Sequence, residues 1–371
     1  MESPPPRPRI VYLALADARG HLMRAHLLRE LLAPEGVDVE IVTTSDAGRR
    51  FLEALGTPAE VISPRFRVVY DARHDMRRHR TTARTLLYLA SPWGLRVDRR
   101  RLRVRGQGAA FVVSDSLHPA LLLAPRGQRV VQVYGQNILA ATLGHFGAPS
   151  LLGRVHRAVI ERSLHRAFAR LEHTLAPDPD EARSIQLPPI IPCPRPRASQ
   201  GSRAVIYLNP HFRDPAIARA IEDALRTRGL AIHAVGEGYG DREGWVPHDP
   251  ALVDAVAEAT LFVTGAGMGG LGMARAFGTP TVCLVSRQPE QRANARQIRG
   301  DAAIEALLLP TARPLATALG EAIDRVRAAA PDSAPHAPCD AAERIQQQWV
   351  RTFLGLVARA DRRPMHHERI H

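Results

Sequence analysis

Lysine, cysteine, aromatic residues and long apolar runs are absent or scarce in this chain of 371 residues. All 50 of its basic residues are arginine, which is typical of the codon bias of a GC-rich genome. No apolar run approaches the ~20 residues that a membrane-spanning helix needs, and the N-terminus lacks the basic-then-apolar order of a signal peptide. We therefore expect a soluble, cytoplasmic protein, and its length favours two domains.

The few cysteines exclude two further classes of protein. Cys193, Cys283 and Cys339 are widely spaced, odd in number and in no metal-ligand pattern. The sequence therefore predicts neither a disulfide framework nor a metal site. The net charge of +13 is compatible with acidic partners, but the arginine-rich composition bias explains it as well. No nucleic-acid-binding motif accompanies that charge, so nucleic acid is not an expected partner.

Short β-branched runs alternate with segments of helical periodicity, which predicts an α/β protein with parallel sheets. The expected strands of the first half are Arg9–Ala16, Val37–Thr43, Ala109–Asp115 and Arg129–Tyr134. Those of the second half are Arg203–Leu208, Leu230–Val235, Thr260–Thr264 and Thr281–Val285. Ligands of such sheets bind beyond the carboxyl ends of the strands.

These patterns predict two Rossmann-like domains, at residues 1–186 and 203–338. A proline-rich linker at 187–202 joins them, because proline fixes φ and removes hydrogen-bond donors. An amphipathic helix at 339–360 is expected to pack back on the first domain, since its apolar residues recur three to four apart. The polar tail at 361–371 is expected to be disordered.

Two residues of the first half are candidates for catalysis. Gly20 permits a tight turn after the first strand, and His21 then begins a helix. A histidine there is suited to general-base catalysis, because its pKa lies near working pH; helix capping explains it equally well. Asp115 ends a later strand and can orient the His21 ring by accepting a hydrogen bond, although its local sequence alone favours a helix N-cap.

The stronger signal lies in the second half. The segment Gly265-Ala266-Gly267-Met268-Gly269-Gly270-Leu271-Gly272 follows an expected strand and opens a helix. Glycines let the backbone approach a ligand closely, and free N–H groups gather at the positive end of the helix. The pattern predicts a diphosphate site, although tight packing alone also uses such turns.

Five short motifs follow one another in the order of a known family. They are Gly20-His21-x-x-Arg24, Trp245-Val246-Pro247-His248 with Leu252, Phe262-Val263-Thr264 with Gly267, Gly278-Thr279-Pro280, and Glu290-Gln291-x-x-Asn294. In these motifs the chain resembles the GT-B glycosyltransferases of the UDP-glycosyltransferase and MurG type, over nearly its whole length. The resemblance implies two Rossmann-like domains with parallel sheets facing a central cleft, and a C-terminal helix that crosses back to the first domain.

The resemblance also implies a role for each motif. His21 would activate an acceptor hydroxyl as general base, oriented by Asp115. The co-substrate would be a nucleotide-diphosphate sugar, and transfer would invert the anomeric centre without a metal or a further cofactor. The donor-binding residues would be Trp245 and Val246 at the nucleobase, Gly265, Gly267, Met268, Gly269 and Gly270 at the diphosphate, and Glu290 and Gln291 at the sugar. The acceptor side would include Gly20, Arg24 and His118.

Three positions depart from the family pattern. Met273 falls where the family has a glutamate that grips the nucleotide ribose, Leu271 falls on its threonine, and Gly265 falls on the histidine that opens the loop. Helix packing is an alternative explanation for Met273. A non-catalytic accessory protein therefore stays open as an alternative function. A nucleotide-sugar hydrolase or epimerase on the same fold is another.

Thirteen arginines lie between Arg65 and Arg105, including Arg99-Arg100-Arg101. The resemblance places this region near the acceptor site, so it would bind a small-molecule or lipid-linked acceptor of negative charge, or an anionic membrane surface. An ordinary solvated surface is the slightly favoured alternative. The one Asp-x-Asp sequence, at 178–180, predicts a surface turn rather than a metal site.

Overall fold

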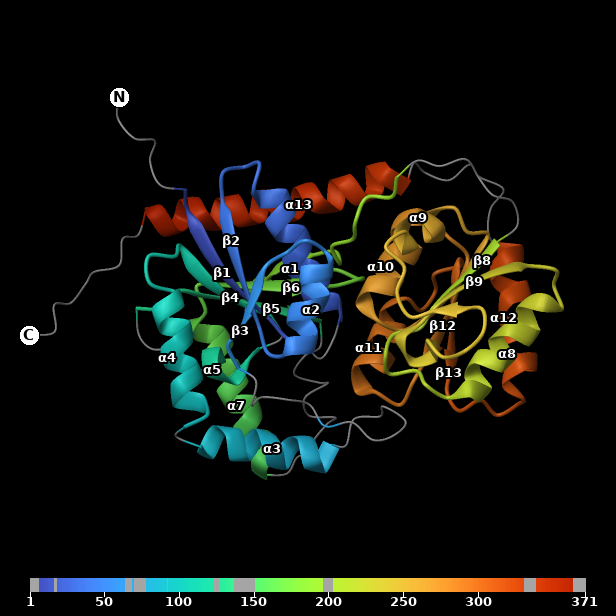
Figure 1. Ribbon diagram of the computed structural model, residues 1–371, viewed down its shortest axis with the longest axis horizontal. Helices are drawn as coiled ribbons and strands as arrows, with labels where there is room; N and C mark the ends of the chain where they lie inside the picture. The colour runs from blue at the N-terminus through green and yellow to red at the C-terminus, as the bar shows by residue number, and fades with distance from the viewer. Residues whose placement is uncertain are drawn as a thin grey trace, which may run out of the picture. The chain divides into compact units, whose positions relative to one another are not determined.

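The computed structural model describes residues 7–16, 19–63, 69, 78–91, 93–115, 117–122, 124, 127–136, 151–195, 203–329 and 338–362. The chain divides into two compact units (Figure 1). Unit 1 comprises Met1–Val69, Arg78–Leu187 and Gln346–His371, and unit 2 comprises Tyr70–Arg77 and Pro188–Ile345. Two stretches lie outside the described residues: 196–202 of the expected linker and 363–371 of the expected tail.

Unit 1 contains a seven-stranded sheet in the order β3-β2-β1-β4-β5-β6-β7, and all of its neighbouring strands are parallel. The strands are β1 (Arg9–Ala14), β2 (Asp38–Thr43), β3 (Ala59–Val61), β4 (Phe111–Asp115), β5 (Val130–Gly135), β6 (Ala169–His173) and β7 (Ile185–Leu187). The central strands are buried along nearly their whole length. Burial on both faces is the reason that they appear in the sequence as continuous apolar runs.

The helices of unit 1 connect these strands. They are α1 (Arg19–Leu32), α2 (Asp46–Ala54), α3 (Arg78–Ala90), α4 (Leu95–Arg105), α5 (Pro119–Leu122) and α7 (Leu151–Arg166). The last helix, α13 (Pro338–Asp361), enters this unit at Gln346. Its Trp349 and Phe353 are fully buried, and the Phe353 ring lies 6.0 Å from that of Phe111 on β4. This part of α13 therefore belongs to the core of the first sheet.

Unit 2 contains a six-stranded parallel sheet in the order β10-β9-β8-β11-β12-β13. Its strands are β8 (Arg203–Tyr207), β9 (Ala231–Val235), β10 (Trp245–Val246), β11 (Leu261–Gly265), β12 (Thr281–Val285) and β13 (Ile304–Leu308). The helices are α8 (Pro215–Arg226), a short 3-10 turn (Glu237–Tyr239), α9 (Leu252–Ala257), α10 (Met268–Phe277), α11 (Pro289–Gln297) and α12 (Leu315–Ala329).

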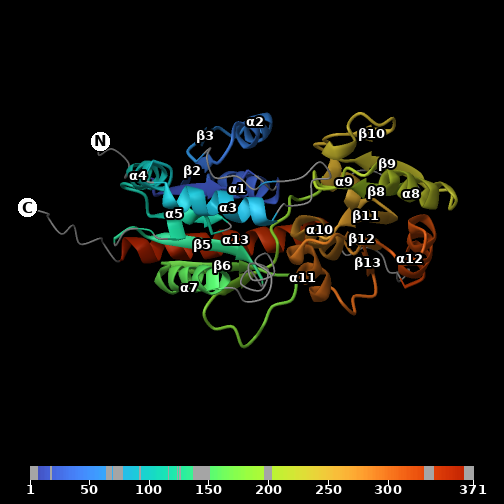
Figure 2. The same cartoon turned by 90° about the horizontal axis from the view of Figure 1, so that it is seen from below.

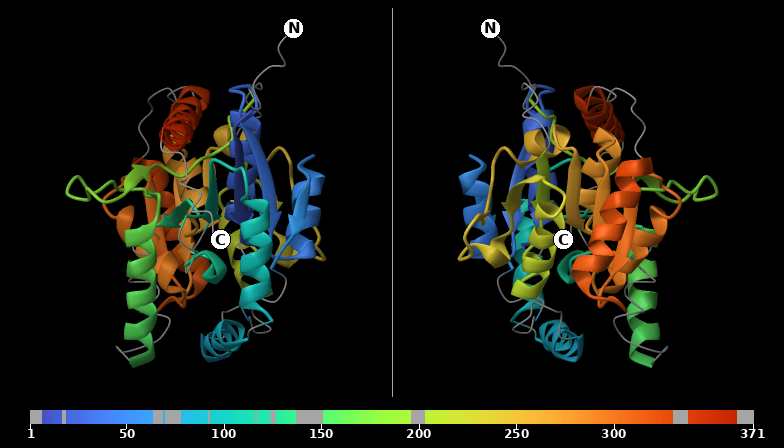
Figure 3. Two further views of the ribbon diagram at one scale, coloured as in Figure 1. Left: turned by 90° about the vertical axis from the view of Figure 1, so that its left-hand side faces the viewer. Right: turned by 90° about the vertical axis from the view of Figure 1, so that its right-hand side faces the viewer.

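Helices cover both faces of the second sheet. Figure 2 shows α8 and α12 on one face and α9, α10 and α11 on the other, and the right-hand view of Figure 3 looks onto α8 and α12. Local sequence sets the helix ends. Asp214 caps α8 by accepting a hydrogen bond from the backbone N–H of Ala216 at 2.9 Å. Gly278 ends α10 in the left-handed conformation, with φ of 66°.

All eight strands predicted from the sequence are present, with ends that differ by at most two residues. The five missed strands are β3, β6, β7, β10 and β13. Four of them lie at sheet edges, where one exposed side removes the need for a continuous apolar run. Strand β6 alternates apolar and polar residues instead. Among the described helices, none combines the length and hydrophobicity that a membrane crossing requires.

Candidate active site

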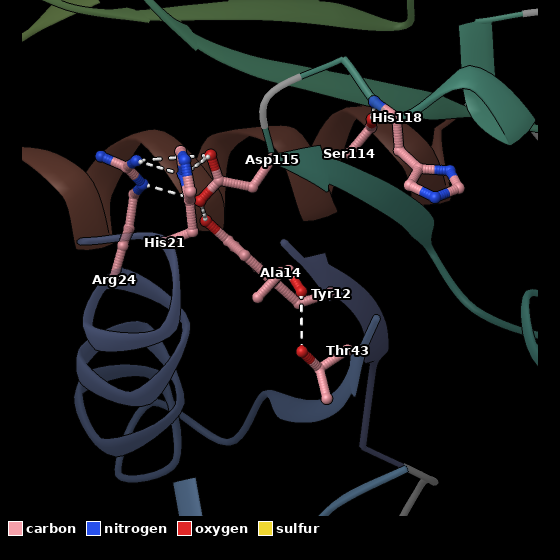
Figure 4. Close-up of polar contacts among 8 residues, drawn as sticks. All are labelled: Tyr12, Ala14, His21, Arg24, Thr43, Ser114, Asp115 and His118. Carbon is pink, nitrogen blue, oxygen red and sulfur yellow. Dashed lines mark hydrogen bonds and ion pairs between the residues drawn. The ribbon is translucent and has the colours of Figure 1, made fainter. Parts of the chain in front are cut away.

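The carboxyl edge of the first sheet holds a buried polar cluster around Asp115, the last residue of β4 (Figure 4). His21 Nδ1 lies 2.9 Å from Asp115 Oδ1. Arg24 Nε and the Tyr12 hydroxyl each donate to Asp115 Oδ2 at 2.9 Å. His21 and Arg24 lie one turn apart on α1, and Tyr12 comes from β1. The fold therefore brings together His21 and Asp115, the two catalytic candidates of the sequence.

Asp115 is completely inaccessible to solvent. Burial alone would raise its pKa, but the positive charge of Arg24 and the hydrogen bonds from His21 and Arg24 outweigh burial and hold that pKa below its ordinary value. Burial and the adjacent carboxylate raise the pKa of Tyr12, so its phenol stays protonated and donates to Asp115. The cluster thus contains a carboxylate that is ionised at neutral pH.

The proton of His21 can be assigned from its neighbours. Nδ1 faces both Asp115 Oδ1 and, at 3.2 Å, Arg24 Nη2. A guanidinium only donates hydrogen bonds and a carboxylate only accepts them. The contact with Arg24 therefore requires an unprotonated Nδ1, and the contact with Asp115 requires a protonated one. The carboxylate is the charged acceptor, and we assign the Nδ1 proton to the bond with Asp115. Nε2 then carries the lone pair that can accept a proton.

Arg24, expected on the acceptor side, is instead a buried partner of Asp115. Burial would lower its pKa, but Asp115 raises that pKa above its ordinary value. Its guanidinium carbon lies 6.0 Å from the centre of the Trp349 ring, so α13 supplies a cation–π contact beneath it. Gly20 is exposed, with open space where a Cβ would be. Of the acceptor-side residues, only Gly20 therefore faces solvent.

His118 was also expected on the acceptor side, and the structure corrects that assignment. The side chain is fully buried, and Nδ1 accepts from the backbone N–H of Ala120 at 3.2 Å. Its ring packs edge-on against Tyr88 and points away from the Asp115 carboxylate in Figure 4. Burial lowers the pKa of His118 to about 3. The residue is therefore a neutral core histidine and presents no surface to a ligand.

A histidine that the sequence analysis missed lies at the same edge of the sheet. His173 ends β6 beside Gly135 of β5, and a Cβ on that glycine would lie 3.1 Å from the His173 ring. Within the described part of the chain, neither ring nitrogen has a hydrogen-bond partner. The strand register places His173 on the sheet face of Asp115. Burial, then the charge of Arg24, lowers its pKa well below the ordinary value.

In unit 2 the glycine-rich segment forms the start of α10. Gly267 is the N-cap in an extended conformation, and no side chain caps the helix. The first helical residues, Met268, Gly269 and Gly270, have no acceptor within the helix for their N–H groups. No acidic residue lies in this first turn. The positive end of α10 is therefore not neutralised by a side chain of its own turn.

The five glycines of this segment have two different uses. Gly267 and Gly269 have open space where a Cβ would be. A Cβ on Gly265 would lie 2.7 Å from the ring of Phe212, and one on Gly270 would lie 2.5 Å from Thr264 Oγ1. Gly265 was assigned to the donor site, but packing against Phe212 is the reason for its missing side chain. Only two of the glycines leave room for a ligand.

The Glu290-Gln291-x-x-Asn294 motif lies on α11 and contacts the backbone of the glycine segment. Asn294 Nδ2 donates to the Ala266 carbonyl at 2.9 Å. Gln291 is 3% exposed, and its Oε1 accepts from the backbone N–H of Ser286 at 2.9 Å. Gln291, expected to bind sugar hydroxyls, therefore holds the loop after β12. Glu290 is exposed beside it and keeps a side chain that a ligand can reach.

Trp245, expected at the nucleobase, lies in the core of unit 2. It is 6% exposed, packs against Tyr239 and donates from Nε1 to Glu222 at 2.7 Å. The ring therefore has no exposed face on which a base could stack. Val246 is 41% exposed, and its carbonyl accepts from the N–H of Gly236 at 2.9 Å.

Leu271 and Met273, the two residues of α10 that depart from the family pattern, pack in the protein interior. Leu271 is fully buried and Met273 is 6% exposed. A glutamate at position 273 would lose its hydration in this setting, which makes a carboxylate costly there. Helix packing, one of the two explanations left open by the sequence, accounts for Met273.

No protein-family model matches the chain, and no curated protein matches its sequence. Solved structures do match over almost the full length of both chains. The glycosyltransferase of kitacinnamycin has a TM-score of 0.60 at 18% identity, covering 96% of this chain and 98% of that one. Glycosyltransferase VinC, in complex with dTDP, has a TM-score of 0.61 at 17% identity, and the match covers 96% of this chain and 100% of that one.

This chain has the GT-B fold. A plant structure agrees, since UGT2 of Phytolacca americana, complexed with UDP-2fluoro-glucose and pterostilbene, has a TM-score of 0.60 at 12% identity and covers 95% of this chain and 100% of that one. The two parallel sheets with their helices are those of the two Rossmann-like domains of that fold. The fold expected from the short motifs is confirmed.

Proposed function

We propose that this chain is a glycosyltransferase that moves a sugar from a nucleotide-diphosphate sugar to an acceptor hydroxyl, with inversion. The observation that carries the proposal is the bond between His21 and the ionised, buried Asp115. The bond orients the ring and stabilises the imidazolium that forms when Nε2 takes a proton. His21 itself is 19% exposed in its side chain, so a substrate can reach it.

In the proposed reaction His21 Nε2 takes the proton of the acceptor hydroxyl. The acceptor oxygen forms a bond to the anomeric carbon as the bond from that carbon to the diphosphate oxygen breaks. The electron pair of the broken bond leaves with the nucleoside diphosphate, and attack opposite the leaving group inverts the centre. The proton that His21 holds is then released to solvent.

The start of α10 is the proposed diphosphate site. Backbone N–H groups at a helix N-terminus stabilise the negative charge that develops on a departing diphosphate. Space at Gly267 and Gly269 lets the ligand approach, and Glu290 is the proposed partner of a sugar hydroxyl. Because these N–H groups supply the positive charge, the proposed transfer requires no metal ion.

The Asp-x-Asp sequence at 178–180 is an exposed turn, in which the Asp180 N–H donates to Asp178 at 3.0 Å.

The structural neighbours support the classes of substrate. VinC is described in complex with dTDP, and the Phytolacca enzyme with UDP-2fluoro-glucose and pterostilbene. We propose a nucleoside diphosphate sugar as donor and a small-molecule or lipid-linked hydroxyl compound as acceptor. An anionic acceptor or membrane surface at the arginine-rich helices α3 and α4 is a further part of this proposal.

A panel of dTDP- and UDP-sugars, each with and without candidate acceptors, tests the function through release of nucleoside diphosphate. Release that depends on an acceptor and is lost in His21→Ala supports glycosyl transfer. Release at the same rate without an acceptor identifies a nucleotide-sugar hydrolase. Nucleotide binding without any turnover across the panel identifies an accessory protein, for which the buried Met273 and Gln291 would be the reason.

A further inference from the structure

Two cysteines that are distant in the sequence meet in unit 2. Cys193 lies six residues after the end of β7, while Cys339 and Glu343 lie one turn apart at the start of α13. The two sulfur atoms and a carboxylate oxygen of Glu343 all lie within 4.8 Å of one another. Cys339 Sγ is 3.3 Å from Glu343 Oε1. Three metal-ligating atoms from two chain segments therefore converge on one point.

The 3.3 Å between Cys339 Sγ and Glu343 Oε1 matches the spacing of two ligands on a tetrahedral zinc ion, and the third atom lies within 4.8 Å of both. Zinc binds thiolate sulfur at ~2.3 Å and carboxylate oxygen at ~2.0–2.2 Å, which places ligand atoms of a tetrahedron ~3.3–3.8 Å apart. Cys193 and Cys339 are only half-buried and Glu343 is exposed, which leaves these side chains room to rotate. Thiolates select zinc over magnesium or calcium.

The three groups together favour a bound cation over a disulfide. A disulfide would use only the two sulfurs and would leave the Glu343 carboxylate against them. A divalent cation attracts all three groups. The third cysteine, Cys283, is fully buried in β12 and does not belong to the cluster.

We propose that Cys193, Cys339 and Glu343 bind one zinc ion. Binding replaces the two thiol protons, which leave to solvent, and forms two Zn–S bonds and one Zn–O bond. Water completes the tetrahedron. No oxidation state changes.

The site ties the two segments that connect the units of the chain. The chain passes from unit 1 to unit 2 after Leu187 and returns at Gln346. Cys193 follows the first passage, and Cys339 and Glu343 precede the second. The ion therefore closes a loop that contains all six strands of the second sheet. Closing a long loop restricts the unfolded chain, so the ion stabilises unit 2 without touching the proposed reaction.

The test uses the full-length, reduced and metal-free chain titrated with Co²⁺, whose thiolate bonds give a near-ultraviolet charge-transfer band and whose tetrahedral complexes give strong visible bands. We expect saturation at one ion per chain, release of two protons, and displacement of Co²⁺ by Zn²⁺. Cys193→Ser and Cys339→Ser should each weaken binding at least tenfold and reduce the charge-transfer band. Glu343→Gln should weaken binding while leaving that band in place.

Cys283→Ala is the matched control, since it removes a thiol outside the cluster. Unchanged Co²⁺ affinity in this variant supports the assignment. Zn²⁺ should raise the thermal midpoint of the native chain and of Cys283→Ala but not that of Cys193→Ser. The proposal is overturned if Cys193→Ser binds Co²⁺ as the native chain does. It is also overturned if the metal-free chain, kept in air, loses two thiols to a Cys193–Cys339 disulfide faster than it takes up equimolar Zn²⁺.

Discussion

The carboxyl edges of the two sheets offer opposite kinds of chemistry on similar scaffolds. In unit 1 the edge carries side chains: Asp115 accepts hydrogen bonds from Tyr12, His21 and Arg24. In unit 2 the edge carries backbone, because Gly267 at the start of α10 and Gly269 in its first turn lack side chains and no side chain caps the helix. Its neighbouring polar residues, Gln291 and Asn294, bond to loop backbone.

The difference follows from the charges that each edge has to stabilise in the proposed reaction. Proton transfer needs a titratable side chain held in one tautomer, which a buried, ionised carboxylate paired with Arg24 provides. A diphosphate carries several negative charges over a wide area, which a row of N–H groups matches without a titratable group. Substitutions should therefore act through lost side chains in unit 1 and through added side chains in unit 2.

The largest effect is expected from His21→Ala. Loss of the general base should lower kcat about a thousandfold, while nucleoside diphosphate affinity, measured by calorimetry, stays unchanged. His26→Ala is the control, because His26 lies on the same helix and bonds to Thr57 at 2.7 Å, away from Asp115. Turnover of His21→Ala equal to that of His26→Ala would remove His21 from the mechanism.

Asp115→Asn should reduce both activity and stability. The sequence predicted a loss of base orientation alone, but the structure shows that Asp115 also balances the buried charge of Arg24. Leaving that charge uncompensated should lower the free energy of unfolding by about 3 kcal/mol, measured by urea denaturation. In an Arg24→Met background the same substitution should cost less stability. Equal costs in the two backgrounds would contradict the pairing.

Gly267→Asp tests the backbone edge. The position has an extended backbone and open space, and aspartate is a favourable N-cap. The variant should fold at least as stably as the native chain, yet its carboxylate should repel a diphosphate and weaken UDP or dTDP binding at least tenfold. Gly267→Ser, a cap without charge, is the control and should bind more tightly than Gly267→Asp. Equal affinities in the two variants would place the diphosphate elsewhere.

The buried histidines of unit 1 predict a pH dependence of stability. The pKa of His118 falls from an ordinary value of ~6.5 to about 3. Between these values the unfolded chain binds a proton that the folded chain does not, so stability rises with pH, at up to ~1.4 kcal/mol per pH unit for this residue. His118→Phe should reduce the slope of the urea midpoint against pH between pH 4 and 6.5. Above pH 7 the slope should equal that of the native chain. An unchanged slope in this variant would mean that His118 titrates normally in the folded chain.

The smallest effect is expected at α4, where Arg100 and Arg101 are exposed. Replacing Arg99, Arg100 and Arg101 with glutamine should weaken association with phosphatidylserine vesicles, and added salt should have the same effect on the native chain, since exposed charges are screened over ~8 Å. Donor binding in unit 2 should not change. Vesicle binding and salt response equal to those of the native chain would identify the arginines as ordinary solvated surface.

Sequence reasoning predicted the buried strands because each needs an unbroken apolar run in a parallel sheet. It missed β6, whose polar residues break that run, and with it His173 at the end of the strand. A histidine after a recognised parallel strand would have been a candidate. The glycine segment was recognised, but its sequence did not separate Gly267 from Gly265, since all glycines carry the same local signal and only the facing atoms differ.

What the sequence by itself determined was the order of strands and helices, the fold, and the positions of His21, Asp115 and the start of α10, because local periodicity and strand ends place these features. Tertiary structure decided which side chains meet. It paired Arg24 with Asp115, buried His118, Trp245 and Gln291, and brought Cys193 close to Cys339. These outcomes depend on contacts between residues far apart in the chain, and sequence spacing carries no information about such contacts until the fold brings the segments together.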